Sequence, residues 1–186
     1  MSNKLKKYIP NEFKESIYEV DFFALYENGY RLLLIDIDNT LASYKTILPT
    51  KENLKLIEDL QQMGFEVILI SNNKFKRVST FAAPFKDLEF VSFAMKPLKK
   101  GYKKALRKAK MPYQDFEVAS IGDQLMTDVK GTKKMGFYSI LVSPIEKKTD
   151  VLSTRINRYF ENKKLKKIKK KYPEIYKEVL KDYASM

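Results

Sequence analysis

The sequence predicts an α/β fold: a three-layer sandwich in which a five-stranded, mostly parallel sheet lies between two layers of helices. Between residues 31 and 143, short apolar runs typical of buried parallel strands alternate with longer amphipathic segments. The chain has 186 residues, 44% of them hydrophobic, which suffices for one core. The sequence contains no internal repeat and no Gly/Ser-rich linker, so we expect a single α/β domain.

Each element follows from a local pattern. The helices are expected at about residues 51–63, 74–82, 98–110 and 125–135. The first has clear signals at both ends, because Thr50 is a favourable N-cap residue and Gly64 follows the last turn. The expected strands are Arg31–Ile35, Phe65–Ile70, Leu88–Ala94, Phe116–Ile121 and Phe137–Val142. Strands that alternate with helices predict βαβ units and hence parallel neighbours.

Two segments flank the expected core of residues 31–145. Residues 1–30 are expected to form an amphipathic helical lead-in, because apolar residues recur there at spacings of three and four. These residues are Phe13, Ile17, Val20 and Ala24.

Residues 146–186 are expected to form a basic helical extension. Residues 147–186 carry 13 Lys and Arg against 5 Asp and Glu, a large share of the net charge of +13. Such a block suggests a polyanion partner, either nucleic acid or anionic lipid. A solvated helix face that only keeps the protein soluble explains the composition equally well.

The absence of His and Cys from the sequence excludes several kinds of chemistry. Without His there is no Ser-His-Asp triad and no His-ligated zinc, and without Cys there is no thiol nucleophile or disulfide. Catalysis would have to use carboxylates, lysines, hydroxyls, backbone amides and a hard cation. The apolar runs are too short for a signal peptide or a membrane span. We therefore expect a cytoplasmic protein that is able to bind a membrane surface.

Polar residues follow four consecutive predicted strands, where an open parallel sheet binds its ligands. The four sequences are Asp36-Ile37-Asp38-Asn39-Thr40-Leu41, Ser71-Asn72-Asn73, Lys96-Pro97 and Gly122-Asp123, with Asp128 five residues after Asp123. Clustered carboxylates repel one another unless a cation neutralises them, and an all-oxygen site suits Mg²⁺. An aspartate nucleophile, a second aspartate that transfers a proton and a lysine that neutralises charge are the groups that phosphoryl transfer needs.

These four motifs, in this order, resemble those of the haloacid dehalogenase (HAD) superfamily of phosphatases over about residues 30–145. The strings at 38–41, 71–78 and 122–128 resemble more narrowly the YqeG-type proteins of subfamily IIIA, relatives of the mitochondrial phosphatidylglycerophosphate phosphatase. The resemblance implies a HAD-like, Rossmann-type fold. It also implies a Mg²⁺-dependent phosphatase.

The resemblance implies roles for the residues of the first two motifs. Asp36 would be the nucleophile and a Mg²⁺ ligand. Asp38 would be the general acid and base, with its backbone carbonyl on the metal. Thr40 would support the first loop beside the phosphate, which Ser71 and Asn72 would bind.

The later motifs receive roles in the same way. Lys96 would stabilise the aspartyl-phosphate, and Asp123 would ligate Mg²⁺. Asp128 would either bind a metal-bound water or orient Lys96. Arg77 is a candidate ligand for a second substrate phosphate, or else a surface cation of its helix.

The spacing of the motifs leaves no room for a cap domain. Thr40 and the helix expected at residue 51 are about 10 residues apart, and a helix and a strand fill the chain between Ser71 and Lys96. Within the superfamily this pattern resembles enzymes whose large substrate covers the site. The expected substrate is phosphatidylglycerophosphate at the inner membrane face, with Phe22 and Phe23 of the lead-in inserted shallowly into the lipid.

Two other functions remain open at this point. The first is a nucleic-acid or ribosome-associated binding protein that keeps the fold. The second is a phosphatase of proteins or soluble phosphoesters. A P-loop site is excluded, because Gly131 and Gly136 have the glycine spacing but Phe137 stands where the motif requires Lys.

Overall fold

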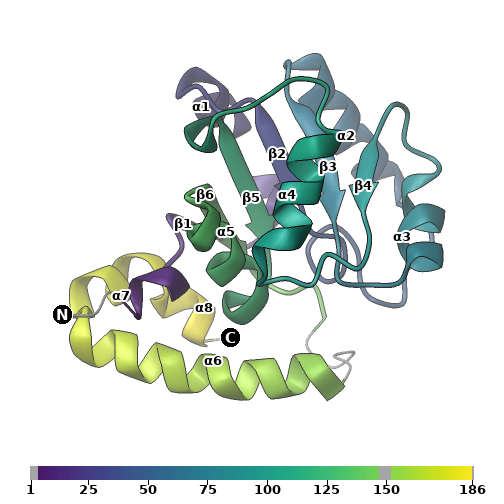
Figure 1. Cartoon of the computed structure of the whole chain (residues 1–186). Helices are drawn as coiled ribbons and strands as arrows, with labels where there is room; N and C mark the ends of the chain where they lie inside the picture. The colour runs from purple at the N-terminus through teal and green to yellow at the C-terminus, as the bar shows by residue number, and fades with distance from the viewer. Residues whose placement is uncertain (1–3, 147–151, 186) are drawn as a thin grey trace.

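The computed structural model describes residues 4–146 and 152–185 and contains one parallel sheet of six strands, in the order β1-β6-β5-β2-β3-β4 (Figure 1). Five of the strands are those that the sequence predicts. The strands in sheet order are β1 (Glu12–Lys14), β6 (Tyr138–Val142), β5 (Val118–Gly122), β2 (Leu32–Ile35), β3 (Glu66–Ile70) and β4 (Glu89–Val91).

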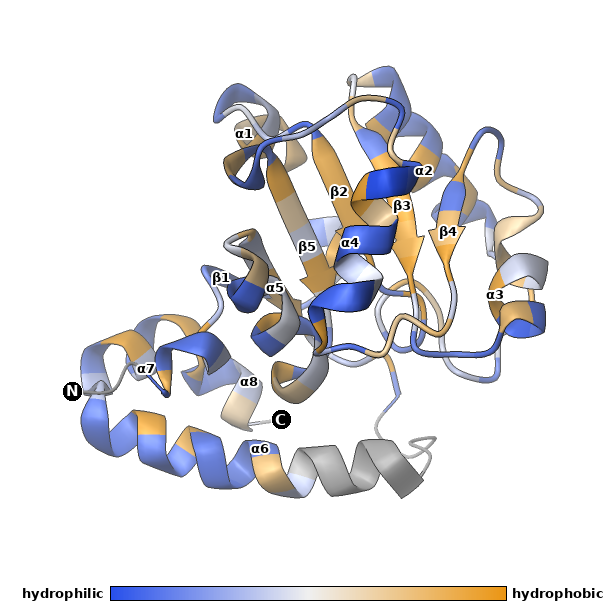
Figure 2. Cartoon of the chain, viewed as in Figure 1, coloured by the Kyte–Doolittle hydropathy of each residue, from blue (hydrophilic) through white to orange (hydrophobic). Residues whose placement is uncertain are grey.

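Helices cover both faces of the sheet, which confirms the three-layer sandwich. The side chains of β2 alternate between the two layers: Leu33 and Ile35 lie in one core, and Leu32 and Leu34 lie in the other. The first core lies beneath α1 (Phe22–Glu27), α2 (Lys51–Gln62) and α3 (Phe75–Ala82). The second lies beneath α4 (Lys99–Lys108), with α5 (Lys130–Met135) beside it. Figure 2 shows the strands between these layers as predominantly hydrophobic.

The lead-in is not one amphipathic helix, and the prediction of five strands was wrong by one. Residues 12–14 form β1, which pairs in parallel with β6, and a 3₁₀ turn η2 (Ile17–Glu19) separates β1 from α1. Asn11 anchors this edge, because its Oδ1 accepts the N–H of Ser139 at 2.9 Å. The apolar residues that recur at spacings of three and four belong to separate short elements, and each element packs an apolar side chain against the core.

The lead-in also does not present two adjacent phenylalanines to a membrane. Phe22 is buried and packs edge-to-face on Phe65, with ring centroids 6.4 Å apart. Only Phe23 is exposed. The expected insertion of Phe22 into lipid is therefore wrong.

No domain is inserted between Asp36 and Lys96, as the spacing predicts. After β2 the chain forms a loop and α2, and after β3 it forms only α3 and β4 before it reaches Lys96. Residues 36–96 therefore form no cap domain over the carboxyl ends of the strands.

The segment after residue 151 forms three helices: α6 (Leu152–Lys171), α7 (Pro173–Val179) and α8 (Lys181–Ser185). Apolar residues of α6 and α8 pack against the η1 turn (Lys6–Tyr8) and the π-helical turn η4 (Leu125–Val129), forming a third core. The lysines at the C-terminal end of α6 are mostly exposed, and the coloured part of this helix in Figure 2 is mainly hydrophilic. Among the described residues, no helix is both long and apolar enough to cross a bilayer.

Candidate active site

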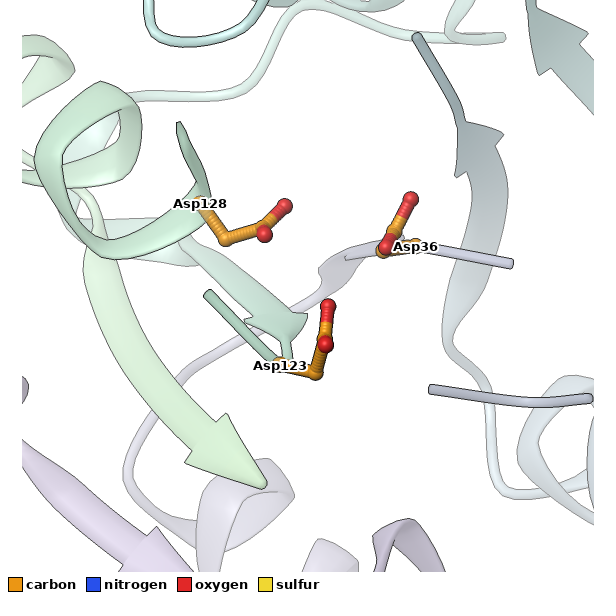
Figure 3. Close-up of side chains that lie close together, drawn as sticks. All are labelled: Asp36, Asp123 and Asp128. Atoms are coloured by element: carbon orange, nitrogen blue, oxygen red, sulfur yellow. The ribbon is translucent and has the colours of Figure 1, made fainter. Parts of the chain in front are cut away.

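Three buried aspartates lie together at the carboxyl edge of the sheet. Asp36 directly follows β2, Asp123 directly follows β5, and Asp128 lies on η4. One carboxylate oxygen from each lies within 4.8 Å of the other two. Figure 3 shows the three carboxylates converging on one space. The structure thus unites the first and fourth motifs, which are far apart in the sequence.

Lys96 reaches into this cluster from the loop after β4. Its Nζ lies 2.6 Å from Asp36 Oδ1 and 2.6 Å from Asp128 Oδ1, and its side chain is 3% exposed. Two short charge-assisted hydrogen bonds fix the ammonium group between the two carboxylates. The side chain of Asn72 in turn holds the backbone of Lys96: Oδ1 accepts its N–H at 2.7 Å, and Nδ2 donates to its carbonyl at 3.2 Å.

Burial and neighbouring charges shift the pKa values of this cluster. Burial raises the pKa of Asp36 to about 7; Lys96 acts in the opposite direction, and Asp128 and Asp38 add to the rise. Burial alone would lower the pKa of Lys96, but the carboxylates of Asp128 and Asp36 outweigh it and raise that pKa. Lys96 therefore stays charged, whereas Asp36 can lose or gain a proton near neutral pH.

The Asp38 side chain faces a different set of partners. Its Oδ2 accepts hydrogen bonds from Ser71 Oγ and Asn73 Nδ2, both at 3.3 Å, and its Oδ1 forms an ion pair with an Arg77 nitrogen at 3.0 Å. The carboxylate of Asp38 is not one of the three in the aspartate cluster. The sequence motifs did not identify Asn73 as a site residue, although it stands next to Ser71 and Asn72.

The Arg77 side chain extends from α3 toward Asp38 rather than into solvent. Its side chain is 17% exposed and pairs with Asp38. A second nitrogen donates to the carbonyl of Ile47 at 3.2 Å, which ties α3 to the loop that follows the first motif.

Tight local packing orients the carboxylates of Asp128 and Asp36. Asp128 Oδ2 accepts hydrogen bonds from Thr127 Oγ1 at 2.9 Å and from the Gln124 N–H at 3.2 Å. A side chain at Gly122 is excluded, because its Cβ would lie 2.4 Å from the carboxyl carbon of Asp128. Thr40 Oγ1 lies 3.5 Å from Asp36 Oδ2, a marginal hydrogen bond.

The donor set of the aspartate cluster fits a hard divalent cation. All the donors are carboxylate oxygens, they are buried, and they lie close enough to share one ion. A softer metal would favour His or Cys, and the sequence contains neither. Asp36, Asp123 and Asp128 are thus the residues that could hold Mg²⁺.

Comparison with known proteins adds independent evidence. Residues 3–146 match the family model described as mitochondrial PGP phosphatase. The chain is 34% identical over 168 residues to the "probable phosphatase YqeG" of Bacillus subtilis (strain 168), a match that covers 90% of this chain and 95% of that protein.

The solved structures that resemble this fold have lower sequence identity to the chain. The putative HAD-hydrolase YfnB from Bacillus subtilis, bound to magnesium, has a TM-score of 0.49 at 14% identity, with 60% of this chain and 88% of that one covered. An uncharacterized protein from Listeria monocytogenes serotype 4b has a TM-score of 0.47 at 18% identity, with 67% and 88% covered. The extent of the family match, together with the similarity to the Bacillus phosphatase along nearly the whole chain, shows that this protein belongs to the mitochondrial PGP phosphatase family of HAD-type phosphatases.

Proposed function

We propose that this phosphatase is a Mg²⁺-dependent phosphomonoester hydrolase that works through an aspartyl-phosphate on Asp36 and acts on phosphatidylglycerophosphate at the inner face of the cell membrane. The observation that carries the mechanism is the buried cluster of Asp36, Asp123 and Asp128 with Lys96 fixed between two of its carboxylates. The family description supports the substrate.

In the first step, an oxygen of Asp36 forms a bond to phosphorus while the bond from phosphorus to the ester oxygen breaks. Asp38 donates its proton to the departing ester oxygen, so that this oxygen leaves as the hydroxyl group of phosphatidylglycerol. The ion pair with Arg77 and the hydrogen bond from Ser71 hold the Asp38 carboxyl at the mouth of the site.

In the second step, Asp38 takes a proton from a water molecule, whose oxygen bonds to phosphorus as the Asp36–phosphorus bond breaks. This step releases inorganic phosphate and restores both carboxyl groups. Lys96 neutralises negative charge on Asp36 and on the phosphoryl oxygens in both steps. The Ser71 hydroxyl and the Asn72 backbone amide bind phosphoryl oxygens. Asp36 and Asp123, with Asp128 close by, would hold Mg²⁺, which would supply Lewis-acid stabilisation of the phosphoryl group.

A group of exposed apolar side chains supports a lipid surface as the source of the substrate. Seven of them lie on loops at the carboxyl edge of the sheet, the edge that carries the aspartates, and Phe75 is the first residue of α3. We call them the apolar rim: Tyr44, Ile47, Leu48, Phe75, Phe93, Met95, Leu98 and Ile145. Large exposed apolar side chains that gather at one edge of a sheet are typical of interaction sites.

The loops that carry the apolar rim contact one another. The Phe93 N–H donates to the Asn73 carbonyl at 2.9 Å, and the Ile145 N–H donates to the Asn39 carbonyl at 3.1 Å. The basic helix α6 packs on η4, which follows the carboxyl end of β5 and so belongs to the same edge. Exposed apolar side chains and a basic helix at the same edge of the sheet favour an anionic bilayer, which attracts the lysines and accepts the apolar groups.

The test is phosphate release from vesicles that contain phosphatidylglycerophosphate, compared with release from nucleotides, sugar phosphates and a phosphopeptide. We expect lipid turnover that needs Mg²⁺ and is lost in Asp36→Asn. Release that survives both EDTA and Asp36→Asn would contradict the mechanism. Turnover confined to soluble esters would contradict only the lipid substrate.

A matched pair of surface variants tests the apolar rim. Ile47→Ser with Leu48→Ser removes two exposed rim side chains, whereas Phe116→Ser removes one that is 73% exposed just before β5, at the opposite edge of the sheet. We expect only the rim variant to lose vesicle co-sedimentation and lipid turnover, with turnover of soluble esters unchanged. Equal loss in both variants would contradict a lipid-facing rim.

A further inference from the structure

We infer that the C-terminal helices are part of the catalytic apparatus, and that Glu161 of α6 and Tyr183 of α8 are positioning residues for the metal-binding loop. The inference rests on the proposed Mg²⁺-dependent function. Both residues lie beyond residue 146, where the family match ends, and neither belongs to any of the four motifs.

Tyr183 contacts the backbone of a candidate metal ligand. Its hydroxyl lies 3.0 Å from the backbone carbonyl of Asp123 and 3.0 Å from Glu161 Oε2. Glu161 Oε1 accepts the N–H of Met126 at 3.1 Å. Glu161 is 2% exposed and Tyr183 is 8% exposed, so water does not compete strongly for these hydrogen bonds. The two side chains therefore form hydrogen bonds to the loop between Asp123 and Asp128 at two points.

One peptide unit connects Tyr183 to both aspartates of this loop. The peptide that joins Asp123 to Gln124 places its carbonyl against the Tyr183 hydroxyl, and its N–H donates to Asp128 Oδ2 at 3.2 Å. The orientation of this peptide plane thus sets the direction of the Asp128 carboxylate and the backbone from which the Asp123 side chain extends. Partners of this kind, which act through the metal ligands, commonly set metal affinity.

The third core explains how the helices can hold the loop firmly. Leu125 and Val129 of η4 are fully buried against a cluster that includes Leu165, Ile168 and Leu180. A buried carboxylate at 161, whose charge is expensive to desolvate, adds directed hydrogen bonds that an apolar side chain cannot make.

The first experiment compares Tyr183→Phe with Tyr159→Phe in the full-length protein. Both variants lose one hydroxyl, but Tyr159 is 58% exposed on the same extension. Isothermal titration with Mg²⁺, and with Mn²⁺ as a second probe, measures metal affinity without relying on activity. We expect Tyr183→Phe to weaken binding by about 10-fold and Tyr159→Phe to bind like the wild type.

The second experiment distinguishes position from charge at residue 161. In Glu161→Gln the amide can accept the Met126 N–H through its oxygen and donate to the Tyr183 oxygen, which leaves the Tyr183 proton on the Asp123 carbonyl. Glu161→Ala offers none of these bonds. We expect near wild-type affinity for Mg²⁺ in Glu161→Gln and weaker binding in Glu161→Ala. Equal weakening in both variants would overturn the positioning role.

Thermal unfolding in EDTA provides the folding control. Variants that remain folded at 25 °C without metal, yet bind Mg²⁺ more weakly, support the inference. Lower melting temperatures with unchanged Mg²⁺ affinity would overturn it, because the residues would then only stabilise the fold. Failure of the wild type itself to bind Mg²⁺ or Mn²⁺ would instead overturn the proposed function, and the inference with it.

Discussion

Replacement of Lys96 by Met tests whether this ammonium group neutralises the buried carboxylates. Lys96 Nζ lies 2.6 Å from an oxygen of Asp36 and 2.6 Å from an oxygen of Asp128. Removal of one partner from a buried ion pair typically destabilises a protein by about 3–5 kcal/mol, because the remaining charge is left uncompensated. Each kcal/mol lowers the melting temperature of a chain of this size by about 2–4 °C. The metal-free variant should therefore melt roughly 6–20 °C below the wild type at pH 7.5.

The pH dependence of this deficit separates electrostatics from lost packing. Burial raises the pKa of Asp36 to about 7, and Lys96 is the neighbour that lowers it, so the pKa in the variant should rise further. When folding raises the pKa of a carboxyl group, the ionised group lowers the free energy of unfolding at pH values above the folded-state pKa. This loss of stability diminishes as the pH falls below the folded-state pKa and the group takes up a proton. The deficit should therefore shrink between pH 7.5 and pH 5.

Circular dichroism melts in EDTA at both pH values measure the effect. Lys99→Met, at an exposed lysine of α4, is the matched control and should melt like the wild type. A deficit of equal size at pH 5 and pH 7.5 would refute the electrostatic reasoning and would leave only lost packing around residue 96.

Three further predictions follow from the same contacts. Asp36→Asn should reduce phosphate release at least about 10³-fold yet fold normally, since Asn keeps the shape and removes a buried charge; a simultaneous loss of the circular dichroism signal would contradict this. Mg²⁺ affinity, measured by titration at pH 6 and pH 8, should be weaker at pH 6, because protonation of Asp36 below its pKa of about 7 competes with the metal; equal affinity would count against Asp36 as a ligand. Arg77→Met should reduce phosphate release by up to about 10²-fold, because Asp38 loses the ion pair that fixes the position of its carboxyl group; unchanged release would remove Arg77 from this role.

Local patterns in the sequence predicted most of the fold, because the central strands are buried on both faces and bounded by strong helix signals. They failed at β1, which has only three residues and whose existence depends on pairing with β6, far away in the sequence. The Phe116–Ile121 strand began too early for a similar reason. Phe116 is apolar but 73% exposed, on the turn before β5, and its composition alone resembles that of a strand residue.

The positions of the four motifs predicted which side chains meet at the sheet edge, since the carboxyl ends of parallel strands share that edge. They did not predict the contacts from Glu161 and Tyr183, which cross long sequence separations. One signal for Glu161 was present in the sequence: residues 161, 165 and 168 recur at helical spacing, and the acid occupies the first position of a stripe whose other members are Leu165 and Ile168. In a lysine-rich segment, a single acid on the apolar stripe of a helix indicates a buried partner.

The sum of the charges explains how a bound cation and a rigid loop would act together at this site. Asp36, Asp123 and Asp128 with Lys96 carry a formal charge of −2 when all four groups are ionised, which matches one divalent cation. Without the cation, the mutual repulsion can be relieved either by movement of the Asp123–Asp128 loop or by uptake of a proton. The hydrogen bonds from Glu161 and Tyr183 oppose movement of this loop. Protonation of Asp36 near neutral pH is then the remaining route. The similarity to the Bacillus phosphatase covers 90% of the chain and therefore extends past residue 146, into the C-terminal segment.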